Sequence, residues 1–442
     1  MTKRVAILGA GISGLASAYY LQRKGIKPVV FEATSDIGGL GSVFRHDGIA
    51  IERFYHVMLN SDRHLMRLLR DLNLAGSVQW TKTGMGFHVG GKLYPFNTAL
   101  DLLRFGALSL GSRVRTGMAA LALSRMEGGE QLDDVPVDQF LRDNFGQDAF
   151  EKIWEPLLKA KFGDLYTQVP AYWFLNRMRR EKSGGPEVKG YLEGGYRGIA
   201  NSLESAIRFG GGEVRRNSLV SSVSDTGNGV RIVTNGHMEE FDAVISTLPL
   251  PLLRQVAEGP LQLEVPLPEL KYQGVVNVVL VSKEPLQPYY WNAVLHPKFP
   301  FQGIVETTRV IPTKWTRGKH IIYLMNYCQP GSEAYERPDD LLRRQAINGI
   351  KGLYPGFNPA AIEGSYVFRA PYVEPVWPVG YLKQKPPTQI PYSNVFLCTT
   401  AHAYPQVNAW NTSIGLARQV ARETAAHVKS SAHSERLAGL AL

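Results

Sequence analysis

The stretch VAILGAGISGLASA, which begins at Val5, constrains the fold of this chain more than any other part of its 442 residues. A short apolar run is followed there by Gly9, Gly11 and Gly14 in the spacing GxGxxG. Basic residues precede the run and an Ala-Ser-Ala triplet ends it, so the stretch also has the form of a secretory signal with its cleavage site. If the stretch is a signal, the three glycines are removed with it. If the stretch is part of the folded protein, the glycines can form a turn that binds phosphate.

The residues after the glycines decide between these interpretations. The pattern predicts a helix over 15–24, with Gly25 at its C-terminal end, and a buried strand over 28–31 that ends at Glu32. A strand, a glycine turn, a helix and a second strand followed by an acid form the dinucleotide-binding unit. Cleavage after Ala18 would discard all three glycines, so we interpret the stretch as a phosphate-binding turn.

Each residue type in this unit has a physical reason. Gly9 permits the tight turn, Gly11 lets the backbone approach a pyrophosphate, and Gly14 lets the helix pack closely on the sheet. The N-terminus of the helix then directs its free N–H groups and its dipole at the phosphates. Glu32 is placed to bind ribose hydroxyls, and its charge argues against the 2′-phosphate of NADP. The predicted contacts in the turn are Gly9, Gly11, Ile12, Ser13 and Gly14.

A second glycine pair, Gly38-Gly39, follows shortly after Glu32. It resembles the second glycine motif of two-dinucleotide-binding flavoproteins, the superfamily of amine oxidases, protoporphyrinogen oxidases, phytoene desaturases and UDP-galactopyranose mutases. In that superfamily the pair lets the backbone approach FAD, so the resemblance implies FAD as the cofactor. Asp36 and Leu40 stand where the superfamily usually has arginine beside the glycines.

Two later segments resemble the remaining FAD-binding parts of this superfamily. The segment that begins LEGGYRGIANSLES and ends DAVISTLP resembles the middle part, which implies that the backbone of Val220 contacts the adenine. The closing segment NVFLCTTAHAYPQVNAWNTSIGLARQ resembles the last strand and helix, whose N-terminus points at the flavin in those proteins. Thr399 begins the Thr-Thr-Ala that replaces the superfamily's Gly-Asp, and Asn411 and Thr412 are placed at the start of the helix.

The resemblance and the predicted elements indicate an α/β protein: a Rossmann-like FAD-binding domain of the two-dinucleotide-binding flavoprotein type, with a separate α+β substrate domain. A strand over 275–281, with a neighbour over 321–324, predicts a second sheet. An amphipathic helix is predicted over 61–74, with Ser61 as its N-cap. The predicted boundaries are 1–95, 190–255 and 385–428 for the discontinuous FAD-binding domain, 96–189 and 256–384 for the substrate-binding domain, and 429–442 for a frayed C-terminal tail.

His56 and Lys161 are the predicted catalytic residues. His56 lies in IERFYHVML, which resembles the active-site stretch of the mutase and desaturase relatives, and we expect it to bind or to transfer a proton near the flavin. A packed core histidine is the alternative. Lys161 lies in WEPLLKAKFGDLY, and some amine-oxidising relatives use a lysine near the flavin, although we favour a solvated surface position for it. Glu52 and Arg53 are expected to form an ordinary surface ion pair.

Four residues are candidates for contact with the substrate, namely Arg197, Tyr290, Arg309 and Trp410. The arginines offer bidentate contacts to an anionic group. The aromatic side chains would line a cage over the flavin or, alternatively, pack in the core. The sequence contains no Ser/His/Asp elbow, metal-ligand cluster or Walker loop, so we expect no metal and assign the hard chemistry to the cofactor.

Composition limits the partners and the compartment. The net charge is +10, yet no basic run with interleaved aromatics indicates nucleic acid. Two cysteines without metal-ligand spacing fit a reducing compartment, and no run is apolar enough to span a bilayer, so we expect a cytoplasmic protein. Residues 97–126 combine leucine-rich helical faces with four arginines and one acid. That pattern fits peripheral contact at the inner membrane face, or a helical pair that covers the substrate pocket.

These observations lead to three functional hypotheses. The first is an FAD-dependent oxidoreductase that removes hydride from a C–H or C–N centre of an apolar or amphiphilic small molecule and passes the electrons to an unknown acceptor. The second is a redox-neutral flavoenzyme like the UDP-galactopyranose mutases, acting on a sugar nucleotide, which His56 and the stretch KLYPFN over 92–97 favour. The third is a flavin-binding scaffold that has lost its activity. We expect the first.

Overall fold

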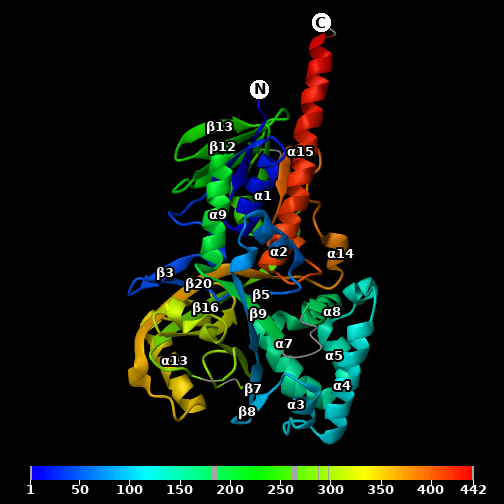
Figure 1. Cartoon of the computed structure of the whole chain (residues 1–442). Helices are drawn as coiled ribbons and strands as arrows, with labels where there is room; N and C mark the ends of the chain where they lie inside the picture. The colour runs from blue at the N-terminus through cyan, green and yellow to red at the C-terminus, as the bar shows by residue number, and fades with distance from the viewer. Residues whose placement is uncertain (1, 181–186, 260–266, 287, 297, 441–442) are drawn as a thin grey trace.

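A five-stranded parallel sheet organises one half of the molecule (Figure 1). In this computed structural model, the structure describes residues 2–180, 187–259, 267–286, 288–296 and 298–440. Neighbouring strands of the sheet pair in parallel in the order β10-β2-β1-β14-β21. Its strands are β1 (Arg4–Leu8), β2 (Lys27–Phe31), β10 (Glu213–Arg215), β14 (Ala243–Ser246) and β21 (Val395–Leu397). The sheet therefore joins three stretches that lie far apart in the sequence.

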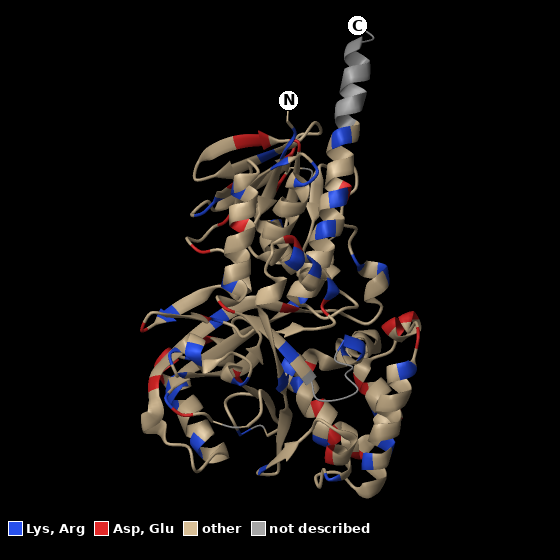
Figure 2. Ribbon diagram, viewed as in Figure 1, with Lys and Arg blue, Asp and Glu red and all other residues tan. Residues whose placement is uncertain are grey.

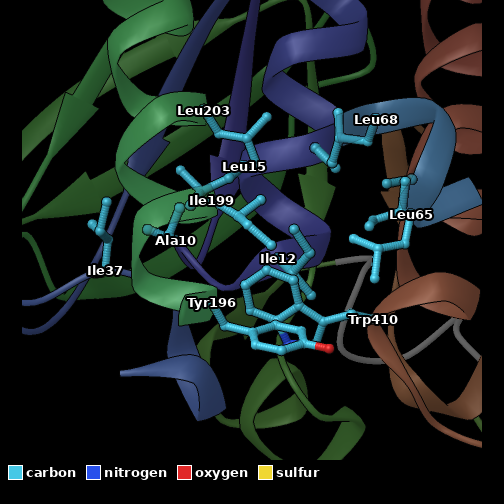
Figure 3. Close-up of a cluster of buried hydrophobic side chains, with 14 of the residues drawn as sticks. Ala10, Ile12, Leu15, Ile37, Leu65, Leu68, Tyr196, Ile199, Leu203 and Trp410 are labelled. Atoms are coloured by element: carbon cyan, nitrogen blue, oxygen red, sulfur yellow. The ribbon is translucent and has the colours of Figure 1, made fainter. Parts of the chain in front are cut away.

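Four helices pack around the glycine turn and form the core beside this sheet. They are α1 (Ile12–Gln22), α2 (Arg63–Asp71), α9 (Gly195–Phe209) and α15 (Trp410–Leu440). In Figure 3, Leu15 of α1, Leu203 of α9 and Leu68 of α2 point toward one another, and Tyr196 and Trp410 lie below them. Full burial of a leucine side chain contributes about 1.5–3 kcal/mol, so this cluster holds the turn rigidly.

A seven-stranded mixed sheet organises the second half. Its order is β20-β16-β19-β18-β17-β7-β8, and only β17 and β7 pair in parallel among its described strands. The strands are β7 (Met85–Val89), β8 (Lys92–Pro95), β16 (Lys271–Ser282), β17 (Trp291–Val294), β18 (Gly303–Glu306), β19 (His320–Cys328) and β20 (Ile362–Val376). The predicted strand over 275–281 and its neighbour over 321–324 are confirmed as β16 and β19. Residues 1–95 contribute strands to both large sheets, since β7 and β8 lie here.

A helical layer covers one side of the seven-stranded sheet and has its own aromatic-rich core. It consists of α3 (Ala99–Leu103), α4 (Leu110–Arg125), α5 (Val137–Phe145), α6 (Gln147–Ala149), α7 (Glu155–Phe162) and α8 (Ala171–Arg180). None of the helices among the described residues combines the length and the apolar character that crossing a membrane requires.

Smaller elements connect and cover these layers. The short sheets use β3 (Val43–His46), β4 (Ile49–Glu52), β5 (Met58–Leu59), β6 (Val78–Thr83), β9 (Glu187–Leu192), β11 (Val220–Asp225), β12 (Val230–Thr234), β13 (His237–Phe241) and β15 (Ala257–Glu258). The other helices are α10 (Leu250–Val256), α12 (Glu333–Glu336), α13 (Asp339–Leu353) and α14 (Tyr381–Gln384).

The boundaries of three predicted helices differ from the structure. The helix expected over 15–24 is α1, which begins at Ile12 and ends at Gln22. The helix expected over 61–74 is α2, which begins two residues later than predicted, and Ser61 is not its cap. The carboxylate of Asp62 accepts hydrogen bonds from the Leu59 amide and from Arg180, so the chain turns at Asp62 before the helix starts. The segment 429–442, predicted as a frayed tail, continues α15 as far as Leu440, because no proline interrupts this alanine-rich stretch.

Candidate active site

The first glycine turn leaves the N-terminus of α1 open. Gly9 has a φ of +97°, which favours glycine, and a Cβ at Gly14 would lie 1.9 Å from the Gly9 carbonyl oxygen. The first amide bonded within this turn is that of Leu15, which donates to Gly11 O at 3.0 Å. Among the described residues, nothing accepts a hydrogen bond from the amides of Ile12, Ser13 and Gly14. These amides are free to bind an anion.

The second glycine motif packs directly on the first. The Gly38 amide donates to the Ala10 carbonyl oxygen at 2.8 Å. A Cβ on Gly39 would lie 3.2 Å from the Gly11 Cα, and both Gly38 and Gly39 have positive φ angles. Two motifs separated in the sequence thus form one cradle whose walls are backbone, and side chains at these positions would fill it.

Glu32 lies at the edge of this cradle, at the carboxyl end of β2. Its Oε2 accepts from the Ala10 amide at 2.9 Å, and its Oε1 accepts from Thr34. The Ser218 amide donates to the Glu32 carbonyl oxygen at 2.8 Å, two residues before Val220 opens β11. The structure therefore brings Glu32 and the start of β11 together at the carboxyl edge of the parallel sheet, where this class of fold binds ligands.

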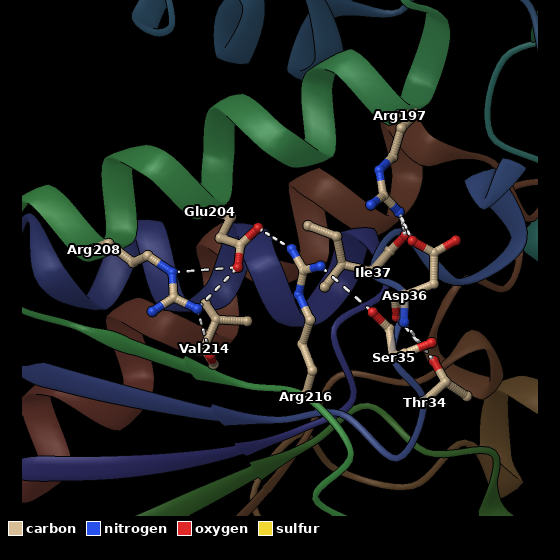
Figure 4. Close-up of polar contacts among 9 residues, drawn as sticks. All are labelled: Thr34, Ser35, Asp36, Ile37, Arg197, Glu204, Arg208, Val214 and Arg216. Carbon is tan, nitrogen blue, oxygen red and sulfur yellow. Dashed lines mark hydrogen bonds and ion pairs between the residues drawn. The ribbon is translucent and has the colours of Figure 1, made fainter. Parts of the chain in front are cut away.

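Arg197 contacts the loop before the second glycine pair rather than a free substrate surface. Its guanidinium pairs with Asp36 and donates to the Ile37 carbonyl oxygen at 2.8 Å (Figure 4). Asp36 stands where the superfamily usually has arginine. In this chain the arginine beside the loop is Arg197, which comes from α9. Arg216 binds Glu204 and the Ser35 carbonyl oxygen beside it. The Arg197 charge is thus compensated by an acid, which leaves it poorly suited to bind an anionic substrate.

His56 lies in a buried aromatic setting. Its ring centroid is 4.8 Å from that of Tyr196 and 5.9 Å from that of Trp410. The His56 Nδ1 lies 2.8 Å from the Phe54 carbonyl oxygen and 3.7 Å from Glu52 Oε2. Because a carbonyl only accepts, Nδ1 carries the proton in the neutral ring and Nε2 is left as the acceptor.

Glu52 is a buried hydrogen-bond acceptor, and the expectation of a surface ion pair with Arg53 is wrong. Glu52 is only 5% exposed, because β4 runs beneath the aromatic cluster. Its Oε1 accepts from the Tyr191 hydroxyl at 2.7 Å and from the Tyr196 amide at 2.9 Å. Burial and the nearby Glu52 charge raise the pKa of Tyr191 well above its usual value, so the hydroxyl stays protonated and donates.

Lys161 is also removed from the surface, contrary to the expectation of a solvated lysine. Its Nζ lies 3.4 Å from Glu374 Oε2 and 5.2 Å from the Tyr327 ring centroid. Glu374 is only 4% exposed, and burial raises the pKa of its carboxyl, while Lys161 opposes that rise. The pair joins α7 to β20, at the junction of the helical layer and the seven-stranded sheet.

Three buried side-chain acceptors lie on β16 and β20 of this sheet. Gln273 and Asn277 lie four residues apart on β16, on the same face of the strand, and Glu374 is the cross-strand partner of Gln273. All three residues are buried, and Gln273 Oε1, Asn277 Oδ1 and Glu374 Oε1 receive no hydrogen bond from the described residues. Buried polar atoms are seldom left in this state, so this face is suited to a ligand that offers hydrogen-bond donors.

Of the three other residues predicted to contact substrate, Arg309 and Tyr290 lie beside charged partners. Arg309 Nε lies 3.1 Å from Oε1 of the fully buried Glu306, so its charge is compensated. Tyr290 is 3% exposed, and Lys189 Nζ lies 5.2 Å from its ring centroid. Trp410, by contrast, packs edge-on against Tyr196 with ring centroids 4.6 Å apart, within the His56 cluster.

The three C-terminal residues predicted to bind cofactor make different kinds of contact. Thr399 follows β21, and its Oγ1 lies 3.1 Å from His402 Nδ1. Asn411 uses its side-chain oxygen to accept from the His64 amide of α2 at 2.8 Å. Thr412 Oγ1 donates to the Val407 carbonyl oxygen at 2.9 Å. Asn411 and Thr412 therefore hold neighbouring backbone, and sequence reasoning missed the Asn411 contact because its partner lies 347 residues away.

The described residues contain no group of three or more His, Cys, Asp or Glu side chains placed to hold a metal ion. The stretch KLYPFN, which favoured a sugar nucleotide, begins with edge strand β8. The side chain of Asn97, at its end, bonds the backbone of Met85. This stretch therefore has a structural role in closing the sheet.

The parallel sheet, the double glycine cradle and the separate substrate sheet define a dinucleotide-binding α/β protein of the flavoprotein type. The chain belongs to the family of flavin-containing amine oxidoreductases, whose profile matches residues 12–423. The predicted superfamily and fold class are thereby confirmed.

Two curated relatives show how far the sequence similarity extends. Coproporphyrinogen III oxidase of Staphylococcus aureus is 27% identical over 284 residues, which are 56% of this chain and 61% of that protein. The 15-cis-phytoene desaturase of Arabidopsis thaliana is 26% identical over 305 residues, which are 62% of this chain and 53% of that protein. The matches thus span little more than half the length of these relatives.

Solved structures extend the similarity in fold over nearly the whole chain. A reduced UDP-galactopyranose mutase superposes with a TM-score of 0.73 at 15% identity, covering 97% of this chain and 99% of its own. An oxidoreductase from Methanosarcina mazei gives a TM-score of 0.71 at 18% identity, covering 93% and 98%. At such identities the likeness concerns the fold alone.

Proposed function

We propose that the protein is an FAD-dependent oxidoreductase that removes hydride from a C–H or C–N centre of an apolar or amphiphilic organic substrate. The observation that carries the proposal is the glycine cradle beside the free amides of α1 and the carboxylate of Glu32. A pyrophosphate accepts hydrogen bonds from such amides, and ribose hydroxyls donate to such a carboxylate. FMN has neither a pyrophosphate nor an adenosine, so these residues fit FAD.

The proposed FAD contacts are the predicted cofactor residues except Asn411 and Thr412, whose side chains bond neighbouring backbone. Arg197, predicted to contact substrate, also takes another role. The glycine turn and its helix amides hold the pyrophosphate, Glu32 and Val220 the adenosine, and Thr399 the region after β21. Arg197 supports the second glycine loop, and Asn411 holds α2 in place beside the site. When bound, the flavin supplies the redox chemistry by accepting the electrons of the hydride.

In this proposal the side chains of the protein bind and orient the substrate, and they accept or donate protons. His56 offers a proton-accepting Nε2, because the contact of Nδ1 with the Phe54 carbonyl oxygen places the proton of the neutral ring on Nδ1. Glu52 fixes the aromatic wall by accepting from Tyr191 and Tyr196. These contacts keep the imidazole in one orientation and exclude water from its faces.

The proposed substrate surface combines apolar and polar parts, which supports an amphiphilic substrate. Gln273, Asn277 and Glu374 offer acceptors to substrate N–H or O–H groups, and Lys161 offers a positive charge. The relatives are named for coproporphyrinogen and for phytoene, two very different molecules. They therefore support the reaction class and leave the substrate itself to experiment.

We further propose that residues 97–126 contact a membrane surface. Four apolar side chains of α4 share one face at spacings of four, four and three residues: Leu110, Val114, Met118 and Leu121. All four are at least half exposed, with Leu110 at 70% and Met118 at 68%. Exposed Arg104, Arg115 and Arg125 complement anionic headgroups.

Anaerobic titration tests the reaction class. We expect one equivalent of substrate to bleach the flavin, and turnover to resume when oxygen or a quinone-like acceptor is added. Steady turnover that needs prior dithionite reduction and consumes no acceptor would support the mutase alternative instead. Purified protein that binds flavin and turns over no candidate substrate would support the scaffold.

Substitution of His56 tests the assigned proton acceptor. His56→Ala removes the imidazole that holds Nε2 in the site, and we expect the rate of flavin reduction to fall by a factor on the order of 100. The rate is measured by stopped-flow absorbance under saturating substrate, with flavin content checked in both proteins. An unchanged rate would return His56 to the role of a packed core histidine.

A further inference from the structure

A strongly basic groove lies between α2 and α15, and no part of the proposed reaction uses it. The groove is open to solvent and has a volume of about 620 Å³. Its charged lining comes from two helices that are far apart in the sequence: Arg63, Arg67 and Arg70 on α2, and Arg418 on α15. His64 of α2 also lines the groove. In Figure 2, blue Lys and Arg positions recur on α2 and along the neighbouring length of α15.

The helical repeat explains why the arginines gather here. Arg63, Arg67 and Arg70 are spaced by four and three residues, so they share the outer face of α2. Leu65 and Leu68 occupy the opposite face and are buried against the core. Burial of the hydrophobic face therefore fixes the orientation of α2, and in this orientation the arginines lie along the groove.

Close packing of the two helices brings Arg418 to the same groove. A Cβ on Gly415 would lie 2.8 Å from Cδ2 of His64, so the glycine lets α2 approach α15. The Asn411 side chain bonds the amides of His64 and Leu65, which holds the start of α2 against α15. The groove is thus a fixed feature of the core rather than a chance meeting of long side chains.

The positive charge in the groove is largely uncompensated. Arg63, Arg67 and Arg418 make no hydrogen bond or ion pair with any group that the structure describes. The acid in the adjoining hollow, Asp71, is bound by Arg23 at 3.0 Å. Burial lowers the pKa of His64, and Arg418 and Arg67 lower it further, so the histidine stays neutral beside its charged neighbours.

We propose that this groove is a binding site for a small polyanion that carries two or more phosphate or carboxylate groups. Guanidinium groups bind both kinds of group in a bidentate manner, and a ligand with several such groups can engage arginines from both helices. The volume of the groove lies within the range of small-molecule sites, and its concave form is suited to a compact ligand. None of the residues that line the groove belongs to the glycine cradle, which the cofactor would occupy.

Calorimetry with two probes tests the proposal on flavin-loaded protein, so that the glycine cradle is filled. Inorganic pyrophosphate and citrate are titrated at low salt, and we expect saturable binding of at least one probe that weakens as salt is raised. The variant Arg67→Gln/Arg418→Gln should weaken this binding at least about tenfold, because it removes two charge-assisted contacts. Flavin absorbance verifies that the variant is folded and loaded.

A matched control separates a site from general charge. The variant Arg45→Gln/Arg344→Gln removes two exposed arginines elsewhere and changes the net charge equally. We expect it to bind both probes as the unaltered protein does. Equal weakening by both variants, or no binding of either probe at low salt, would overturn the proposal. Loss of binding to anionic vesicles in the groove variant, without binding of either probe, would overturn it in favour of a lipid surface.

Discussion

His402 is buried and contacts Thr399, which follows β21. Protonation of His402 should lower the free energy of unfolding by disrupting this end of the parallel sheet. The ring is 4% exposed, with Nδ1 3.1 Å from Thr399 Oγ1 and Nε2 3.3 Å from the Pro387 carbonyl oxygen. The carbonyl requires a proton on Nε2, so Nδ1 accepts from the threonine hydroxyl and both nitrogens of the neutral ring are satisfied. Burial is the main cause that lowers the pKa of His402 to about 4.

The magnitude follows from the two pKa values. An unfolded histidine has its ordinary pKa of about 6.5, so between pH 6.5 and 4 the unfolded chain binds more protons than the folded one. The free energy of unfolding is therefore unaffected above pH 6.5 and falls as the pH is lowered through this window. At pH 4, His402 alone accounts for a loss of about 3 kcal/mol.

Proton NMR of the imidazole ring measures this pKa directly, with His402→Gln to assign the resonance. We expect His402 to titrate near pH 4. Denaturant unfolding at pH 7.5 and pH 4 should show a pH-dependent loss that is about 3 kcal/mol smaller in His402→Gln. A His402 pKa of 6 or above, or an equal loss in both proteins, would refute the reasoning.

Three other predictions follow from single contacts. Gly11→Val should fold, since its Cβ would lie 4.0 Å from the nearest atom outside its chain neighbours, yet lose FAD; full flavin retention in the purified variant would contradict the cradle. Lys161→Met should destabilise the protein by about 3 kcal/mol in denaturant unfolding, because it leaves the buried Glu374 without a charge partner. Adding the change Glu374→Gln should restore most of the lost stability. The double change Leu110→Asp/Met118→Asp should abolish salt-sensitive sedimentation with anionic vesicles, and unchanged sedimentation would exclude α4 as the contact.

The sequence predicted the residues whose roles depend on near neighbours. The glycine turn, the helix after it and the strand ending at Glu32 follow one another closely in the sequence. The spacing of their residues is enough to specify the local backbone geometry. The strand β16 was equally readable, because six of the seven residues over 275–281 are valine or leucine and the seventh is Asn277. The assignment of His56 depended instead on the resemblance of a short string, and its chemical role remains a proposal.

What the sequence determined by itself was the class of fold and the place of the glycine turn, since local sterics and hydrophobic periodicity require no distant partner. The tertiary structure alone decided which charges are compensated: Arg197 by Asp36, Lys161 by Glu374, and Arg309 by Glu306. An ionic contact depends on distance in space, and the first two of these partners lie more than 150 residues apart. Burial decided the rest, because Glu52 and Lys161 look like surface residues in the sequence, whereas in the fold Glu52 is buried and Lys161 pairs with the buried Glu374.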